Sequence, residues 1–344
     1  MNIDELQSGA LIEGRYRVER LIAQGGQAAV YLARQEPLDR RVALKILHAT
    51  PDAPEAEKRT FQQRFLREAK TLATLDHPNI VVIYDYGQIG IGSFYIAMEY
   101  VQGVRFNDLH RGKPLEPTRA LTLISQVCSA LSYAHNRGVI HRDIKHSNLM
   151  VRRGHDGKEQ VKVLDFGIAK MMMDNSDLTL TGTIMGSPHF MAPEQARGMK
   201  LDPRVDIYAV GVLLYCSLTG RYPFEGTSFR EILFAHLGDD VPPFQERNPD
   251  ISLDPNLEAT VRRCLAKEPD ERFPNIDTLQ GTLTSFINGQ PLISTQTLQR
   301  RGIPSSKQKP RAAWLLPVLI AGGAFLITSG LLVAAAAVAY VVMF

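Results

Sequence analysis

Cysteine is scarce in this 344-residue sequence. Cys128, Cys216 and Cys264 are the only three, they lie far apart, and no CxxC pair occurs. Three widely spaced cysteines without a CxxC pair are too few for a disulfide framework and do not have the spacing of a structural zinc site, so neither is expected, and the folded part should lie in a reducing compartment. With 44% apolar and 22% charged residues, the composition also excludes the disordered, fibrous and collagen-like classes.

An excess of positive charge is also missing from most of the chain. The formal net charge is +3, but five of the 39 basic residues lie beyond Asp277, which is the last acidic residue. Residues 1–277 therefore hold 34 basic and 36 acidic groups. Because a nucleic-acid surface needs a clustered excess of Lys and Arg, no nucleic-acid partner is predicted. The five C-terminal basic residues are Arg300, Arg301, Lys307, Lys309 and Arg311.

Charged residues are absent from the run 312–344, which directly follows this basic cluster. A membrane-spanning helix needs about 20 apolar residues, and buried core helices rarely exceed that length without a charge. We therefore predict one transmembrane helix over 312–344, with a buried core helix as the alternative. The positive-inside rule places the preceding residues in the cytoplasm and the C-terminus on the far side of the cell membrane. Since the run ends at Phe344, it is interpreted as a tail anchor or as the span of a longer chain.

Residues 288–311, rich in Gln, Ser, Thr and Pro, are predicted to form a flexible juxtamembrane linker. Its basic cluster either touches anionic headgroups or simply flanks the membrane helix. The N-terminus, MNIDELQSGA, has neither a basic region nor an apolar region, so it is not a signal peptide.

Short alternating apolar runs across residues 15–47 predict three strands in a meander. The turn between the first two contains Gly25 and Gly26, which free the backbone to approach a ligand closely. The third strand carries Lys45 inside an apolar run, and this lysine either serves a site or faces solvent from an edge strand. Helical spacing of apolar residues follows, and Glu68 beside that stripe either reaches Lys45 or pairs with another charge on the helix surface.

The apolar period changes from that of strands to that of helices near residues 98–103. One clear helical face follows, made of Ala120, Ile124, Val127, Cys128, Leu131 and Ala134. A β-rich first lobe is therefore predicted to connect to a helical second lobe.

Three motifs follow in order and each occurs once: HRDIKHSN at residues 141–148, DFG at 165–167 and MAPEQ at 191–195. Together with Lys45 and Glu68, they resemble the protein kinase family, and most closely the bacterial Ser/Thr kinases that share the eukaryotic-type catalytic domain. The resemblance covers about residues 12–287. It implies an α+β bilobal kinase fold, with an N-lobe over 1–98, a C-lobe over 99–287 and a hinge at 98–103, to which the transmembrane helix is added.

The resemblance implies an ATP-dependent protein serine/threonine kinase that acts on Ser and Thr hydroxyls of protein substrates. Asp143 would accept the proton of the substrate hydroxyl, and Lys145 would stabilise charge on the transferring phosphoryl group. Asn148 and Asp165 would hold Mg²⁺, with Mn²⁺ as an alternative, because hard cations prefer oxygen ligands. Lys45 would bind the α- and β-phosphates while paired to Glu68.

The family resemblance also implies an ATP pocket. Ile22, Gly25, Gly26 and Val30 belong to its phosphate loop and flanking strands, whereas main-chain groups of Glu99 and Val101 would pair with adenine. Met98 would gate the space behind the purine.

The phosphate loop departs from the family's GxGxxG pattern, since Ala23 and Ala28 replace its outer glycines. An alanine keeps its N–H but loses access to positive φ, so altered ATP affinity is expected. This departure supports an alternative reading, a nucleotide-binding pseudokinase that acts as a membrane-anchored scaffold.

A Thr-rich stretch separates the DFG and APE motifs and is typical of an activation loop. We predict that Thr179, Thr181 or Thr183 is autophosphorylated in trans within a transient homodimer, and that Arg142 receives the phosphate. An ordinary solvated Thr-rich loop is the alternative.

Four residues have structural roles by the same resemblance. Ser187 would contact Asp143 and Lys145 through its hydroxyl. The other three would organise the C-lobe, with Asp206 bonded to the catalytic-loop backbone and Glu194 paired to Arg272.

Overall fold

The computed structural model describes residues 7–25, 28–48, 54–90, 92–154, 156–166 and 187–290. The described residues up to 290 belong to one compact unit. The phosphosite candidates Thr179, Thr181 and Thr183, as well as Gly26, the predicted span 312–344 and all but the first residues of the predicted linker, lie outside these ranges. Within them, no helix has the length and apolar character needed to cross a membrane.

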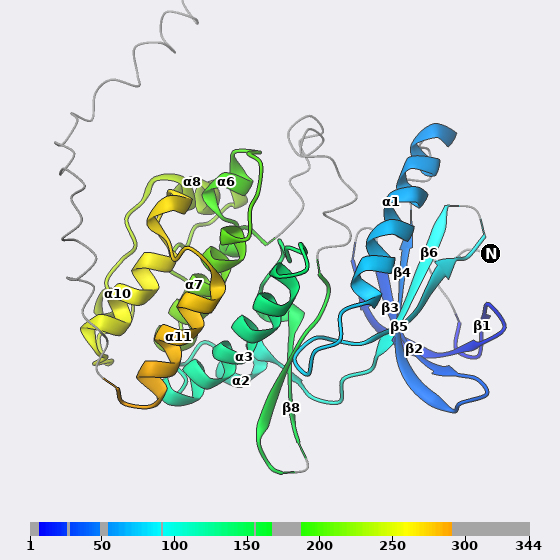
Figure 1. Ribbon diagram of the computed structural model, residues 1–344, viewed down its shortest axis with the longest axis horizontal. Coiled ribbons are helices and arrows are strands. Elements are labelled where there is room, and N and C mark those ends of the chain that lie inside the picture. Colours follow the sequence, from blue (N-terminus) through cyan, green and yellow to red (C-terminus); the bar gives the residue numbers. More distant parts are fainter. Residues whose placement is uncertain are drawn as a thin grey trace, which may run out of the picture. The chain divides into compact units, whose positions relative to one another are not determined.

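The N-terminal part is an antiparallel six-stranded sheet with strand order β1-β2-β3-β4-β6-β5, drawn in blue and cyan in Figure 1. The first three strands of the predicted meander are present as β2 to β4. The strands are β1 (Leu11–Ile12), β2 (Tyr16–Gln24), β3 (Ala28–Gln35), β4 (Arg40–His48), β5 (Ile83–Gln88) and β6 (Ser93–Glu99).

Helix α1 (Glu55–Ala73) covers one face of this sheet. Its buried residues Phe65, Ala69 and Leu72 recur at helical spacing, and Phe65 packs on Phe94 of β6 with ring centroids 4.8 Å apart. The other face of the sheet closes around a second apolar cluster that includes Tyr16, Leu44 and Tyr95. Apolar residues therefore point to both faces of β4, as expected of a central strand.

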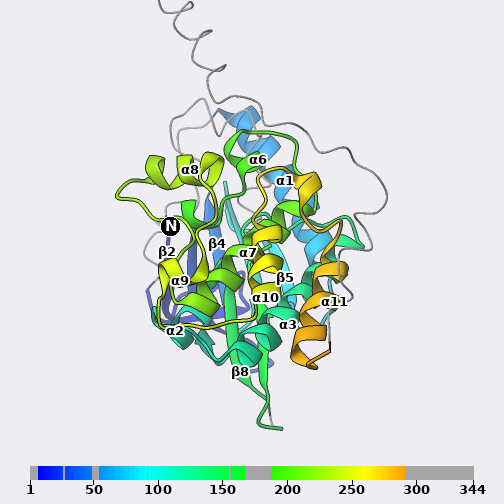
Figure 2. The same ribbon diagram turned by 90° about the vertical axis from the view of Figure 1, so that its left-hand side faces the viewer.

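The C-terminal part is mainly helical. Its helices are α2 (Phe106–His110), α3 (Pro117–His135), α6 (Pro193–Ala196), α7 (Arg204–Thr219), α8 (Phe229–Gly238), α9 (Phe244–Arg247), α10 (Pro255–Cys264) and α11 (Ile276–Ile287). Three short 3₁₀ turns, η2 (His146–Asn148), η3 (Pro188–Phe190) and η4 (Pro269–Glu271), lie between them. Every described residue of α7 after Arg204 is buried, and α3, α10 and α11 pack around it (Figure 2).

A small sheet of β7 (Val104–Arg105), β8 (Leu149–Arg153) and β9 (Glu159–Val163) lies between the two parts. Val161 and Val163 of β9 are buried in the same continuous apolar core as Phe65 of α1 and Leu283 of α11. This arrangement confirms a β-rich lobe followed by a helical lobe, joined where β6 ends at Glu99.

Candidate functional site

The site is built around the loop between α3 and η2. The Asp143 carboxylate lies there with Oδ2 2.8 Å from Lys145 Nζ and 3.0 Å from Asn148 Nδ2. The Asn148 amide also donates to the main-chain oxygen of Asp143 at 2.8 Å. Three of the predicted site residues therefore converge, and the side chains of Asp143 and Lys145 stay 17% and 23% exposed, so that a substrate can reach them.

This loop has a fixed shape because a buried carboxylate holds it. Asp206, near the start of α7 and 1% exposed, accepts the main-chain N–H groups of His141 and Arg142 at 2.8 Å each. Arg142 adopts a left-handed φ of 62°, a strained conformation for a non-glycine residue, and these bonds help to maintain it. The predicted contact of Asp206 with the catalytic-loop backbone is confirmed.

A third partner of Asp206 is His135 Nε2 of α3, at 2.8 Å. Burial by itself would raise the pKa of the Asp206 carboxyl, but the hydrogen bond and charge of His135 outweigh burial and lower this pKa below its ordinary value. Asp206 is therefore an ionised anchor rather than a proton carrier.

Asp165 follows β9 and has a left-handed φ of 46°. Its Oδ1 lies 2.8 Å from Nζ of Lys45, whose side chain is 10% exposed. Lys45 sits on β4 between Val30 of β3 and Ile96 of β6, so it is not an edge-strand lysine facing solvent. The fold thus brings together two residues that are 120 positions apart and that the family motifs place in one site.

The predicted pairing of Lys45 with Glu68 is wrong in this structure. Lys45 pairs with Asp165. Glu68 Oε1 instead accepts a hydrogen bond from Nε of the neighbouring Arg67 at 3.0 Å and lies 2.9 Å from a terminal nitrogen of the same guanidinium. Glu68 nevertheless lies on the buried side of α1, with its side chain 14% exposed.

The strands that would surround a nucleotide are placed as predicted. Ala23 of β2 is in register with Val30 of β3, and Gly25 donates its N–H to Ala28 O at 2.8 Å, closing the turn that follows β2. A methyl group added at Gly25 would meet the nearest atom only at 3.7 Å, so the described fold itself does not demand glycine there.

The hinge residues follow β6. Glu99 donates its N–H to Val82 O at 2.8 Å, and Val101 is buried. Met98 lines a cavity of about 20 Å³ together with Ile96 and Phe166, and its gating of the space behind the purine stays a prediction. The Glu99 side chain, for which no role was predicted, pairs with Lys162 of β9 and Arg152 of β8.

Lys162 is a functional candidate that sequence reasoning missed. The available signal was a lysine between two buried valines in β9, a pattern that resembles the one used to single out Lys45. A buried charge in such a run needs a partner, and the sequence alone did not identify Glu99 as that partner.

The predicted hydroxyl contacts of Ser187 are not formed. Ser187 lines a small polar pocket with Asp143 and Phe190, but among the described contacts it has no side-chain hydrogen bond to Asp143 or Lys145. Those two side chains pair directly with each other instead. Phe190 is buried and its ring meets that of His146 edge-on, with centroids 5.0 Å apart.

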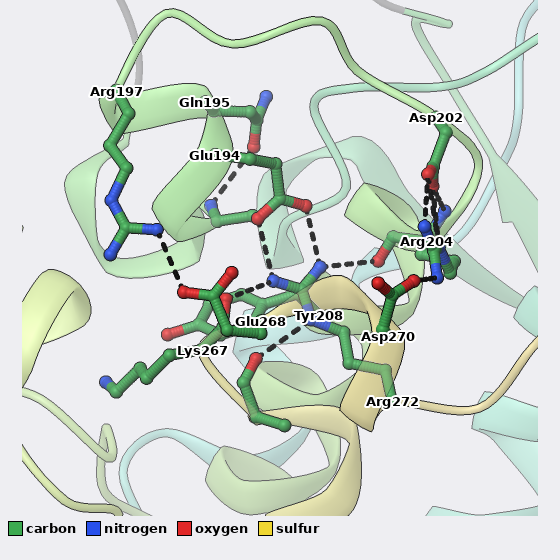
Figure 3. Close-up of polar contacts among 12 residues, drawn as sticks. Glu194, Gln195, Arg197, Asp202, Arg204, Tyr208, Lys267, Glu268, Asp270 and Arg272 are labelled. Carbon is green, nitrogen blue, oxygen red and sulfur yellow. Dashed lines mark hydrogen bonds and ion pairs between the residues drawn. The ribbon is translucent and has the colours of Figure 1, made fainter. Parts of the chain in front are cut away.

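The predicted pair of Glu194 and Arg272 is confirmed (Figure 3). Two parallel hydrogen bonds of 2.6 and 2.7 Å join the guanidinium to the carboxylate, and both side chains are almost completely buried, at 0% and 6% exposed. Arg272 also donates to the carbonyls of Ala266, Lys267 and Arg204, so its donors are all used. The pair fastens the start of α6 to the turn after η4.

Comparison with known proteins places this geometry in context. The sequence model of the protein kinase domain matches residues 16–282. The chain is similar to the serine/threonine-protein kinase pkn3 of Myxococcus xanthus, with 45% identity over 282 residues, 80% of this chain and 50% of the relative. It is 38% identical to the serine/threonine-protein kinase PknB of Mycobacterium tuberculosis, over 81% of this chain and 44% of the relative.

A solved structure is also similar. A single-residue variant of the PknI kinase domain of Mycobacterium tuberculosis matches with a TM-score of 0.62 and 26% identity, over 82% of this chain and 98% of that one. The chain spans half or less of the length of the curated relatives it matches.

Proposed function

Because the chain belongs to the protein kinase domain family, we propose that it is a protein serine/threonine kinase that transfers the γ-phosphoryl group of ATP to Ser and Thr hydroxyls of proteins. One observation carries the proposal: Asp143, Lys145 and Asn148 form a single cluster on an anchored loop. The relatives named as serine/threonine-protein kinases support it. Phosphoryl transfer needs positioning and charge stabilisation more than covalent chemistry, and this cluster supplies both.

Each side chain then has a defined task. The Asp143 carboxylate orients the attacking hydroxyl and receives its proton. The Lys145 ammonium, 2.8 Å from that carboxylate, exchanges this partner for the oxygens of the transferring phosphoryl group. Lys45, on the central strand β4, binds the phosphates that remain on the nucleotide.

The donor set fits a hard divalent cation. The Nδ2 of Asn148 is committed to Asp143, so its Oδ1 is left as a ligand. The main-chain oxygen of Asn148 accepts the N–H of Leu164, the residue before Asp165, at 2.8 Å. In the part of the chain that the structure describes, no group of three His, Cys, Asp or Glu side chains could hold a metal alone. Mg²⁺ is usually held by one or two side chains plus substrate phosphates and water, so we propose that Mg²⁺, or Mn²⁺ in its place, binds here with ATP. The cation would supply neutralisation of phosphate charge.

A pseudokinase that binds nucleotide without transferring phosphate is the second candidate, favoured only by Ala23 and Ala28 in the phosphate loop. Ala23 lies on β2 and Ala28 lies on β3, two strands that pair with each other, and an alanine has the same backbone N–H group as a glycine. The complete set of charged site residues makes the active kinase the better-supported proposal.

A transfer assay decides between the two. The full chain is incubated with γ-labelled ATP, Mg²⁺ and a general protein substrate, alongside Asp143→Asn and the matched control Asp156→Asn. Asp156 is an exposed acid of the β8–β9 hairpin, so its variant should behave as wild type. We expect label in wild type and the control but not in Asp143→Asn. Heat protection by ATP without any label would instead support the pseudokinase.

We also propose that residues 312–344 cross the cell membrane once and hold the kinase domain in the cytoplasm. The uncharged run and the basic residues before it support this. Membranes from expressing cells should retain the chain after alkaline extraction, and deletion of 312–344 should release it. Extraction of the intact chain by alkali would contradict the proposal.

Autophosphorylation in trans completes the proposal, with Thr179, Thr181 or Thr183 as the acceptor. Arg142, next to Asp143, is the residue that would bind the phosphate. Mapping of the label on the wild-type chain tests this. Full activity of the triple alanine variant in an unphosphorylated preparation would contradict it.

A further inference from the structure

An ion-pair cluster joins the two lobes directly beneath the hinge. The carboxylate of Glu99, the last residue of β6, meets two cations that come from the β8–β9 hairpin. Lys162 Nζ lies 2.8 Å from Oε2, and an Arg152 terminal nitrogen lies 2.9 Å from Oε1. Each carboxylate oxygen therefore has its own cation.

The hairpin is built to present these cations. In its register Met150 faces Lys162 and Arg152 faces Gln160, so the four side chains share one face. The opposite face, which includes Val151 and Val161, is buried in the core of the helical lobe. The apolar face thus fixes the hairpin, and the polar face points at the hinge.

Lys162 also contacts the strand that enters the sheet beside β6. Its Nζ donates to Ile80 O at 3.1 Å, and Val81 donates its N–H to Val163 O at 3.0 Å. Because Glu99 in turn donates its N–H to Val82 O, both chain segments at this edge of the sheet are tied to β9. The Lys162 side chain is only 5% exposed, so it cannot exchange these partners for water.

We propose that Lys162 and Arg152 are positioning residues for ATP, which act by holding the Glu99 side chain and thereby its main-chain groups, which the family resemblance assigns to adenine. This inference rests on the proposed function. An ion pair with each carboxylate oxygen leaves the Glu99 side chain little rotational freedom, and a fixed side chain restrains the peptide group to which it is attached. Neither cation needs to touch the nucleotide.

A double-mutant cycle on ATP affinity tests the proposal. Lys162→Met, Glu99→Gln and the double variant are compared in full chains that also carry Asp143→Asn, so that binding is measured by calorimetry without turnover. The matched control is Lys158→Met, a lysine of the same hairpin whose side chain is 86% exposed. We expect Kd for ATP to rise about tenfold in each single variant, because each breaks the buried ion pair between Lys162 and Glu99 that holds the Glu99 side chain.

The double variant should bind ATP no more weakly than the worse single variant, because both substitutions break the same ion pair. Arg152→Gln should raise Kd about threefold, since Arg152 is 35% exposed and holds one oxygen only. This variant keeps the test decisive if Lys162→Met does not fold. Lys158→Met should bind as the parent does.

Two results would overturn the inference alone. One is a lowered melting temperature with Kd for ATP within twofold of the parent. The other result needs the same substitutions in chains that keep Asp143, so that turnover can be measured. A lower kcat with an unchanged KM for ATP would mean that the cluster governs lobe movement instead. If the parent chain itself bound no ATP, the proposed function would be overturned together with this inference. That outcome is distinguishable from the two results above, in which the parent chain binds ATP.

Discussion

Replacing Arg272 by methionine should destabilise the protein strongly. Methionine has a similar length but no charge, so Glu194 would remain buried, at about 5% exposed, without a cation. Three main-chain carbonyls would also lose a donor. Breaking a buried ion pair in this way costs about 3–5 kcal/mol, out of a total stability of about 5–15 kcal/mol. The melting temperature should therefore fall by roughly 6–20 °C.

Thermal unfolding followed by circular dichroism measures this effect on the full chain. Arg197→Met is the matched control, because Arg197 forms a 3.4 Å pair with Glu268 at the surface, with side chains 38% and 62% exposed. Such a pair contributes about 0–1 kcal/mol. The double variant Glu194→Gln with Arg272→Met should recover part of the loss, since no charge is left unpaired. An Arg272→Met variant as stable as Arg197→Met would refute the reasoning.

Three further predictions concern the site and its supports. Asn148→Ala should lower kcat about 10²-fold and raise the Mg²⁺ concentration for half-maximal activity, because it removes a metal ligand and the bond to Asp143; an unchanged Mg²⁺ titration would argue against that ligand. Asp206→Asn should lower the melting temperature and kcat together, since the amide cannot accept all three donors; full activity would contradict the anchoring role. Burial, and then the charge of Lys267, lowers the pKa of His236 from 6.5 to about 3, so its contribution to stability is complete above pH 6.5 and is lost as pH falls toward 3; His236→Gln should flatten the melting curve against pH over that window.

The fold could be predicted well from the sequence. Alternating apolar residues located β2, β3 and β4, and helical spacing located α1 and α3. These patterns work because one face of each element must be buried, which fixes the period of its apolar residues. The order of the three motifs along the chain then indicated the two-lobed kinase fold, and the family model matches the same region of the chain.

The contacts formed by whole motifs were predictable as well. Asp206 holds the catalytic loop, and Glu194 pairs with Arg272, as the resemblance implied. In both cases the charged groups are almost completely buried and must be paired, so the fold settles which groups they contact.

Individual ion pairs in the partly open cleft were less predictable. Lys45 has two acids available, Asp165 and Glu68, and the second also has Arg67 as a neighbour. Which pairs form depends on side-chain positions of about an ångström, and a pair near solvent differs from its rival by only about 1 kcal/mol. Sequence patterns carry no information at that scale. For this reason the predicted pair of Lys45 with Glu68 was wrong, although the motifs correctly placed Lys45 and Asp165 in one site.

Lys162 shows the opposite limit, a strongly determined contact that sequence reasoning passed over. Lys45 and Lys162 both interrupt apolar strands, and both are buried at 8% and 4% exposed. The apolar run singled out the first and the family resemblance then gave it a role, whereas the second, in a similar run, was not singled out. Since burying an unpaired ammonium is prohibitively costly, a lysine inside a buried strand predicts a carboxylate partner whether or not a motif names it. Applied to β9, that rule would have required an acid near the hinge, and Glu99 is the acid that the fold supplies.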